Sequence, residues 1–299
     1  MTYQPDKLRY FALALDPIHI GTGGMRLGRV DMSIVREPGT NLPKIPGTSL
    51  SGAARTYAAM KEAGKFPGCA GQGGHCGDPH CPICVTFGFG GTQNGSFQGL
   101  AQFFDARLLF FPVHSLAGPV WVTCPEALKD LEITINGPVD EQVHVASGVK
   151  QSGRLNLGWL MLEVASNNFA PQVTHVPQEI LNRSVLVSNK MFGHIVNDNL
   201  EVRTSVSIDP QTGASAEGAL FTYEALPRAS VLYFEVVVSD SKFYKIGNQT
   251  PLQDNGGKQK VIQTIQKGLA LFETLGVGGM NTRGMGRLRV LNLSVGGAQ

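Results

Sequence analysis

The chain has 299 residues, of which 42% are hydrophobic and only 16% are charged. This length allows one large domain or two small ones, and the 37 glycines favour a loop-rich α+β protein over a helical one. A net charge of +2 identifies no partner, and no apolar run reaches the roughly 20 residues that a membrane-spanning helix needs. The polar start of the chain does not resemble a signal peptide, so we expect a cytoplasmic protein with reduced thiols and no membrane partner.

Short apolar runs and helical spacings predict the secondary structure in chain order. A first strand at 8–15 precedes a glycine-rich loop, and an i, i+3, i+4, i+7 spacing over 50–57 predicts a helix with a hydroxyl cap in 47–49. The later elements are expected as strands at 101–111 and 120–123, helices at 125–131 and 177–190, strands at 202–208, 219–223 and 230–239, a helix at 258–275 and a last strand at 287–295.

This order predicts a ferredoxin-like βαββαβ core, similar to an RNA-recognition motif, in a single domain over residues 1–299. We expect two insertions into it. One covers 65–99 and holds a cysteine loop and a flexible glycine-rich segment. The other covers about 132–163 and is interpreted as a projecting hairpin.

The cysteine loop is the most informative segment of the chain. Four of the five cysteines lie between 69 and 84, in a stretch that is otherwise almost free of apolar residues. Such a segment cannot offset its own ordering entropy by burial, whereas zinc binding would supply the missing free energy. The expected ligands are Cys69, Cys76, Cys81 and Cys84. The sequence leaves open whether His75 or His80 replaces one of them.

Basic charge is concentrated in two glycine-rich stretches. Residues 26–65 contain seven basic and three acidic side chains, and after Glu273 the chain has three arginines and no acidic residue. Such loops are typical of proteins that bind a phosphate backbone, and ordinary solvated surface charge is the alternative.

Four stretches together resemble the repeat-associated mysterious protein (RAMP) superfamily, and within it the backbone subunits of type III CRISPR effector complexes of the Cmr or Csm type. These stretches are 17–37, 42–55, 109–118 and 275–288. Because the last one follows a predicted helix and precedes a strand, its glycines do not form a dinucleotide-binding turn.

The resemblance implies a palm with a protruding thumb, here assigned to 132–163. Copies of the chain would stack head to tail along a CRISPR guide RNA, beside other type III subunits. Each copy would cut a paired single-stranded target RNA at regular intervals by attack of a 2′-hydroxyl, with Mg or Mn as the catalytic ion and zinc as the structural one.

Candidate site residues follow from this resemblance and from local chemistry. Asp31 occupies the position of the family's cleavage aspartate, and a turn-capping aspartate is the alternative. His19 is a second catalytic candidate or a hydrogen-bonded structural histidine, and Glu224 is a weaker candidate for an acid or metal ligand. The expected RNA-binding residues are Arg26, Arg29, Arg36, Ser49, Arg55, Gly278, Gly279 and Arg283. Ser51 stands where the family usually has a lysine, which weakens the expected contact to guide phosphate there.

The sequence therefore favours a metal-dependent endoribonuclease that works only within a guide-RNA complex. A non-catalytic guide-binding scaffold is the first alternative. A free-standing guide-processing enzyme is the second, but it would need a general acid–base pair, and no His–His or His–Tyr partner for His19 is evident.

Overall fold

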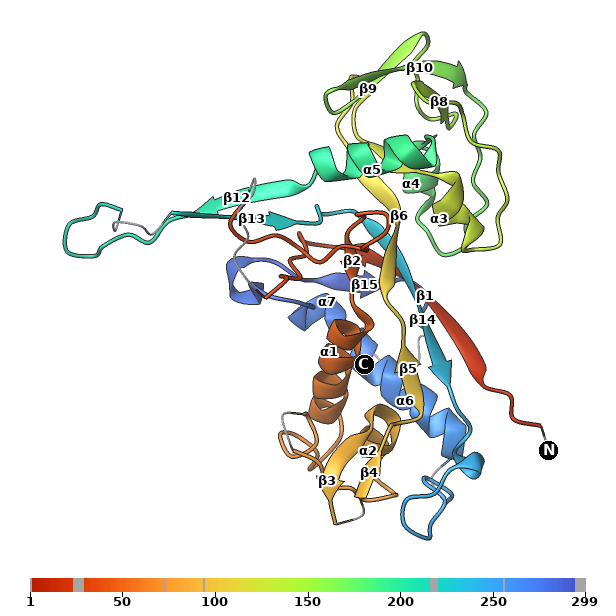
Figure 1. Cartoon of the computed structure of the whole chain (residues 1–299), viewed down its shortest axis with the longest axis vertical. Coiled ribbons are helices and arrows are strands. Elements are labelled where there is room, and N and C mark those ends of the chain that lie inside the picture. Colours follow the sequence, from red (N-terminus) through yellow and green to blue (C-terminus); the bar gives the residue numbers. More distant parts are fainter. Residues whose placement is uncertain are drawn as a thin grey trace.

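The computed structural model describes residues 2–23, 30–71, 74–93, 95–215, 220–254 and 256–293. One eleven-stranded sheet crosses most of the molecule (Figure 1). Its main path runs β15-β1-β14-β6-β7-β11-β8-β10-β9, and two further strands, β2 (Lys44–Ile45) and β5 (Ala101–Phe103), pair beside it. None of the helices in these residues is long and apolar enough to cross a bilayer.

The first part of the sheet contains a βαββαβ unit. Its four strands lie in the order β15-β1-β14-β6, and each neighbouring pair is antiparallel. In chain order the unit consists of β1 (Asp6–Ala14), α1 (Gly47–Met60), β6 (Ala106–Val113), β14 (Val231–Val238), α6 (Gly257–Ala270) and β15 (Leu288–Val290). We call this unit the palm. The two helices pack against each other and cover one face of the sheet.

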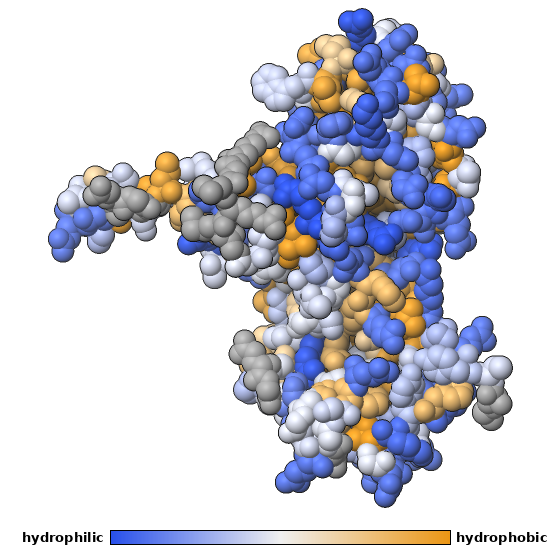
Figure 2. Space-filling view, viewed as in Figure 1, coloured by the Kyte–Doolittle hydropathy of each residue, from blue (hydrophilic) through white to orange (hydrophobic). Residues whose placement is uncertain are grey.

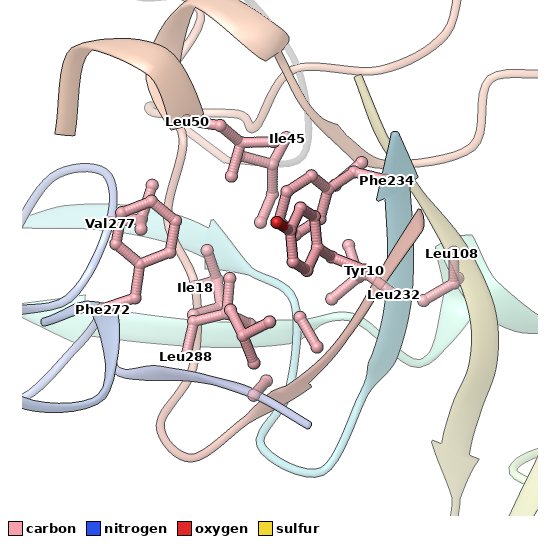
Figure 3. Packing of buried hydrophobic residues seen from close by; sticks show 14 of the residues in the cluster. Tyr10, Ile18, Ile45, Leu50, Leu108, Leu232, Phe234, Phe272, Val277 and Leu288 are labelled. Atoms are coloured by element: carbon pink, nitrogen blue, oxygen red, sulfur yellow. The ribbon is translucent and has the colours of Figure 1, made fainter. Parts of the chain in front are cut away.

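The core of the palm lies between these helices and the sheet. Tyr10 of β1, Leu50 of α1 and Phe234 of β14 are buried there, together with Phe272, which follows α6 (Figure 3). On α6, Val261, Ile265 and Leu269 recur every four residues and bury one side of the helix, as the sequence pattern predicts.

Helix α1 begins differently from the prediction. It starts at Gly47, and no hydroxyl side chain caps it. Instead, the backbone N–H of Gly47 donates to the Asp105 carboxylate at 2.8 Å, so the cap comes from a distant residue that the local pattern cannot reveal. Asp105 also interrupts the predicted strand at 101–111, which the structure divides into β5 and β6.

The second part of the sheet forms an upper lobe with short helices on it (Figure 1). Its strands are β7 (Val120–Thr123), β8 (Gln142–Val145), β9 (Arg154–Leu157), β10 (Leu160–Ser166) and β11 (Ser184–Leu186); its helices are α3 (Pro125–Lys129), α4 (Gln178–Leu181) and α5 (Asn189–Asp198). The predicted helix at 177–190 is therefore wrong. Three buried residues, Ser184 to Leu186, form β11 between α4 and α5, because pairing with β7 and β8 outweighs local helical preference.

The expected projecting hairpin at about 132–163 also differs from the structure. Val143, Val145, Val149 and Leu155 are buried in the lobe, since β8, β9 and β10 extend the main sheet. Trp159, in the turn between β9 and β10, has 94% of its surface exposed.

A different hairpin projects from the molecule. Strands β12 (Glu201–Ser205) and β13 (Phe221–Ala225) pair with each other and extend away from the palm (Figure 1), and we call them and their connection the arm. Apolar residues are visible along the arm (Figure 2), and its exposed members are Val202, Val206, Ile208 and Leu220. A protruding element was expected, but it lies about 70 residues later in the chain than predicted.

The insertion at 65–99 lies at the opposite end from the upper lobe (Figure 1). It contains the cysteine loop, helix α2 (Pro82–Phe87) and a small hairpin of β3 (Phe89–Thr92) and β4 (Gly95–Phe97). Helix α2 packs against both α1 and α6, which ties this insertion to the palm. The remaining elements are α7 (Phe272–Leu275) and two 3-10 turns, Ser241–Phe243 and Asn281–Arg283.

Candidate functional site

The candidate site forms where the segment 30–36 runs beside β13 at the base of the arm. Met32 donates its N–H to Thr222 O at 3.0 Å and accepts a hydrogen bond from Glu224 N at 3.0 Å. These bonds place Asp31 beside Thr222. The glycine loop, residues 276–286, reaches the same place through His19, as described below.

The Asp31 carboxylate is fixed by one residue. Its Oδ2 accepts the N–H of Thr222 at 2.7 Å and the hydroxyl of Thr222 at 2.9 Å. These two hydrogen bonds hold the pKa of Asp31 below its usual value, so the group is a carboxylate at neutral pH. Acceptance of a backbone N–H is what the turn-capping alternative expects, yet among the described residues Oδ1 receives no hydrogen bond.

His19 lies beneath this site and is almost completely buried. Its Nδ1 lies 2.6 Å from the carbonyl oxygen of Glu224, so Nδ1 must carry a proton and donate it. In the neutral ring, Nε2 is then an acceptor. The ring also packs edge-on against Tyr223, at 6.0 Å between centroids. His19 is therefore a structurally anchored histidine with one nitrogen left for other contacts.

Glu224 is an anchor for the segment 30–36. Its Oε2 accepts a hydrogen bond from Arg36 Nη2 at 2.8 Å and from Ile34 N at 3.4 Å. Arg36 also donates to Ile34 O and to Asn197 of α5. Because this ion pair is largely buried and mutually neutralised, the geometry favours a structural role for Glu224 and Arg36 over contact with metal or phosphate.

The glycine loop closes the other side of the site. Gly279 donates its N–H to His19 O at 2.9 Å, and both Gly278 and Gly279 are exposed. Gly278 has a φ of +91°, and a Cβ there would meet His19 O at 2.6 Å, so only glycine fits. Arg283 is also exposed, and its guanidinium lies 5.4 Å from the centre of the Phe221 ring, next to Thr222.

The other predicted RNA contacts lie elsewhere. Ser49 is half-buried in the first turn of α1, and Arg26 and Arg29 lie outside the described residues. Arg55 is buried, and its guanidinium donates to Cys69 O at 2.9 Å and to Gly88 O at 2.7 Å. The structure thus gives Arg55 a place inside the cysteine insertion instead of on a phosphate-binding surface.

Two residues of the site were missed by sequence analysis. Thr222 holds Asp31, and Tyr223 packs against His19. Both belong to a short strand that shows no chemical motif, and 191 residues separate Asp31 from Thr222. Only the pairing of the segment 30–36 with β13 brings them together.

The four cysteines of the loop converge on one point. The sulfur atoms of Cys69, Cys76, Cys81 and Cys84 all lie within 4.8 Å of one another. The Cys76–Cys84 separation is 3.6 Å and the Cys69–Cys81 separation is 3.9 Å. A tetrahedral ion with Zn–S bonds of about 2.3 Å requires sulfur separations of about 3.8 Å. The cluster could therefore bind a structural zinc ion.

Neither histidine of the loop belongs to this cluster. His75 Nδ1 lies 2.7 Å from Arg55 Nη2, and His80 is exposed. Within the cluster, hydrogen bonding from the Cys81 thiol lowers the pKa of Cys84 to about 4, while burial raises the pKa of Cys69 to about 11. Cys124, the fifth cysteine, is buried in the core of the protein.

Comparison with known proteins identifies the family of the chain. The sequence profile of the RAMP superfamily matches residues 12–289. The chain belongs to the RAMP superfamily. Along its length this RAMP protein is 26% identical to the CRISPR system Cmr endoribonuclease Cmr4 of Pyrococcus furiosus, with 92% of each chain covered. Over 86 residues, 28% of this chain and 37% of the relative, it is 38% identical to the CRISPR system Cms endoribonuclease Csm3 of Enterococcus italicus.

Solved structures show the same fold. A subunit of the type III-B Cmr-beta complex bound to cognate target RNA superposes with a TM-score of 0.66 at 16% identity, covering 97% of this RAMP protein and 98% of that chain. Oligomeric Cmr4 from Pyrococcus furiosus gives a TM-score of 0.61 at 19% identity, with 96% and 99% covered.

Proposed function

We propose that this RAMP protein is a guide-RNA-binding backbone subunit of a type III CRISPR complex and that it cuts complementary target RNA. The full-length similarity to Cmr4 supports this role and favours the Cmr type over the Csm type. The observation that carries the proposal is the Asp31 carboxylate, which is fixed through Oδ2 to Thr222 of β13. Phe221, the next residue of that strand, contacts the exposed Arg283, and Gly279 bonds to His19, whose ring packs on Tyr223.

In the proposed reaction, a ribose 2′-hydroxyl of the target loses its proton and its oxygen attacks the adjacent phosphorus. The bond from phosphorus to the 5′-oxygen breaks and that oxygen takes a proton from water, which leaves a 2′,3′-cyclic phosphate and a 5′-hydroxyl. Asp31 is the group that accepts the proton or holds a cation beside the phosphate. The exposed Gly278 and Gly279 let the RNA backbone approach closely, and Arg283 contributes positive charge at the rim.

A catalytic Mg or Mn ion fits the donors that are present. Asp31 Oδ1, which receives no hydrogen bond from the described residues, is a hard ligand, and Mg²⁺ commonly binds through one or two carboxylates together with substrate phosphates. Asp31 would hold the ion, which would neutralise charge on the phosphate. Among the described residues, the cysteine cluster is the only group of three or more potential metal ligands, so a catalytic ion depends on RNA for further ligands.

Zinc is the proposed structural ion, bound by Cys69, Cys76, Cys81 and Cys84. Copies of the chain are the proposed stacking partners, since a relative of the same fold forms oligomers. Other type III subunits complete the proposed assembly.

The test uses the complex purified from co-expressed subunits with its guide RNA. Complementary target RNA is added with and without Mg²⁺, and cuts are mapped for the wild type, for Asp31→Ala and for the matched control Asp254→Ala, whose side chain is exposed. We expect evenly spaced cuts from the wild type and the control, and none from Asp31→Ala, with target binding unchanged. Normal cutting by Asp31→Ala contradicts catalysis at this site. Binding without cuts by the wild type supports the scaffold alternative, in which Asp31 is only a capping residue.

A further inference from the structure

We propose that Thr222 is the positioning residue of the cleavage reaction: it orients the Asp31 carboxylate so that Oδ2 is held and Oδ1 faces the RNA. This inference rests on the proposed function, because it assigns Thr222 a role in the same reaction.

The contact between the two residues is reciprocal. The Thr222 N–H and hydroxyl both donate to Asp31 Oδ2, at 2.7 and 2.9 Å, and Asp31 N donates to the Thr222 hydroxyl oxygen at 3.1 Å. Three hydrogen bonds between two residues define the direction of the carboxylate and the position of its backbone. A single bond would leave the side chain free to rotate about its own axis, whereas two donors to one oxygen fix which oxygen remains available.

Thr222 is itself held on both sides. It pairs with Thr204 in the ladder between β12 and β13, and its carbonyl oxygen accepts the N–H of Met32 at 3.0 Å. Two residues further along, the Glu224–Arg36 ion pair anchors the same strand to the segment 30–36. A threonine also has few χ1 rotamers, so its hydroxyl presents a stiff donor. Among the described residues, the orientation of Asp31 is therefore set by its contact to a strand that is itself held on both sides.

This arrangement has a chemical consequence. A catalytic group must be held close to its reactive geometry by contacts outside the reacting atoms, and small displacements reduce the rate strongly. In this protein the required support comes from the Thr222 hydroxyl, which touches neither the RNA nor a cation in the proposed reaction.

The test compares four variants in the assembled guide-RNA complex. Thr222→Val and Thr222→Ala remove the hydroxyl, Thr222→Ser retains it, and Thr204→Val makes the same change as Thr222→Val at the exposed cross-strand neighbour. Single-turnover cleavage, target-RNA affinity and thermal unfolding are measured for each. Loss of a hydrogen bond to a charged group predicts a cleavage rate lowered by about tenfold to a hundredfold in both hydroxyl-free variants. We expect unchanged target affinity in all four variants and rates near the wild type for Thr222→Ser and Thr204→Val.

The pH dependence of cleavage gives a readout that a merely structural role would not alter. The hydroxyl bond helps to keep the pKa of Asp31 low, so its loss moves the acidic limb of the rate profile to higher pH. Among the described residues, the other titratable or charged groups on the packed elements are His19, Tyr223, Glu224, Arg36 and Arg283, together with Glu201 and Arg203 of β12, and these variants alter none of them.

The outcomes separate the two proposals. If Asp31→Ala is inactive while the hydroxyl-free variants cut at the wild-type rate with an unmoved acidic limb, the Thr222 inference is wrong and the proposed function stands. If the hydroxyl-free variants lose activity and Thr222→Ser does not restore it, Thr222 is only a structural residue and the inference is again wrong. If Asp31→Ala cuts normally, the proposed function itself fails.

Discussion

Substitution of Arg55 tests directly whether its side chain contacts RNA or stabilises the cysteine insertion. Its side chain enters the cysteine insertion, where Nε donates to Cys69 O, Nη1 donates to Gly88 O, and Nη2 lies 2.7 Å from His75 Nδ1. Nη2 also lies 4.0 Å from Cys84 Sγ. The guanidinium therefore ties α1 to three separate segments of the insertion.

Replacement of Arg55 by alanine should destabilise the protein strongly. A hydrogen bond from a charged donor contributes roughly 1.5 to 3 kcal/mol, and the buried carbonyls of Cys69 and Gly88 would lose their charged partner. Because water can enter and satisfy part of this set, we expect the free energy of unfolding to fall by about 3 to 5 kcal/mol. Folded domains are stable by only about 5 to 15 kcal/mol, so this loss is easily measured. The zinc ion proposed for the cysteine cluster should also exchange faster, since the positive charge near Cys84 is lost.

The assay is denaturant unfolding of wild type, Arg55→Ala and Arg55→Lys with zinc in excess, together with RNA affinity measured at several salt concentrations. Lys61→Ala serves as the control, because Lys61 is an exposed cation at the end of the same helix. The lysine ammonium group is a point charge and cannot reproduce the several directed hydrogen bonds of the planar guanidinium, so Arg55→Lys should recover only part of the stability that Arg55→Ala loses. The structural role is refuted if Arg55→Ala keeps wild-type stability and zinc retention while the slope of log RNA affinity against log salt concentration decreases by about the amount expected for one lost phosphate contact.

Three further predictions concern packing, acid stability and metal content. Gly268→Ala should destabilise the protein by about 1 to 3 kcal/mol, because a Cβ there overlaps a backbone carbonyl of α1. Gly52→Ala should stabilise the protein by about 0.5 to 1 kcal/mol, because a Cβ at that position meets nothing within 4 Å. Equal effects of the two substitutions in thermal unfolding would contradict this prediction. Burial raises the pKa of Asp105, but the Lys44 ammonium and the N–H that caps α1 outweigh it, so the net pKa is lowered. The stability that this carboxylate contributes is present at neutral pH and is lost as the pH falls below about 4, so Asp105→Asn should be less stable than wild type at pH 7 and should lose less on acidification. Elemental analysis should find one zinc ion per chain and less in Cys81→Ser, and an equal zinc content in both proteins would exclude the cluster.

Sequence analysis succeeded where a signal is local or periodic. The palm helices follow from apolar spacing, and the four zinc-ligand candidates follow from cysteine density in a segment that has little else to bury. It failed where the determining contact is distant in sequence. Asp105 caps a helix from 58 residues away, and the three residues of β11 are a strand only because two neighbours pair with them.

The candidate site shows the same division. Asp31, His19 and the glycine loop were proposed from the sequence; in the structure Asp31 and His19 both bond to β13, and the glycine loop bonds to His19. Arg55 belongs to one of the stretches that resemble the family, yet its side chain is buried in the structure. Burial of a helix side chain depends on the segments that pack against it, which here belong to the cysteine insertion. The projecting element was assigned to the wrong segment, since Val143 and Leu155 have the same local pattern whether they cover a core or form a tip.

Strand β6 belongs to both the palm and the upper lobe. Its first half pairs with β14 of the palm and its second half with β7 of the upper lobe. Phe110 and Phe111, adjacent in this strand, are each fully buried in different apolar clusters. Bending between the two halves would break ladder bonds and expose aromatic surface on both sides at once, which makes a hinge there energetically costly. We therefore expect the palm and the upper lobe to keep their relative orientation when a partner binds.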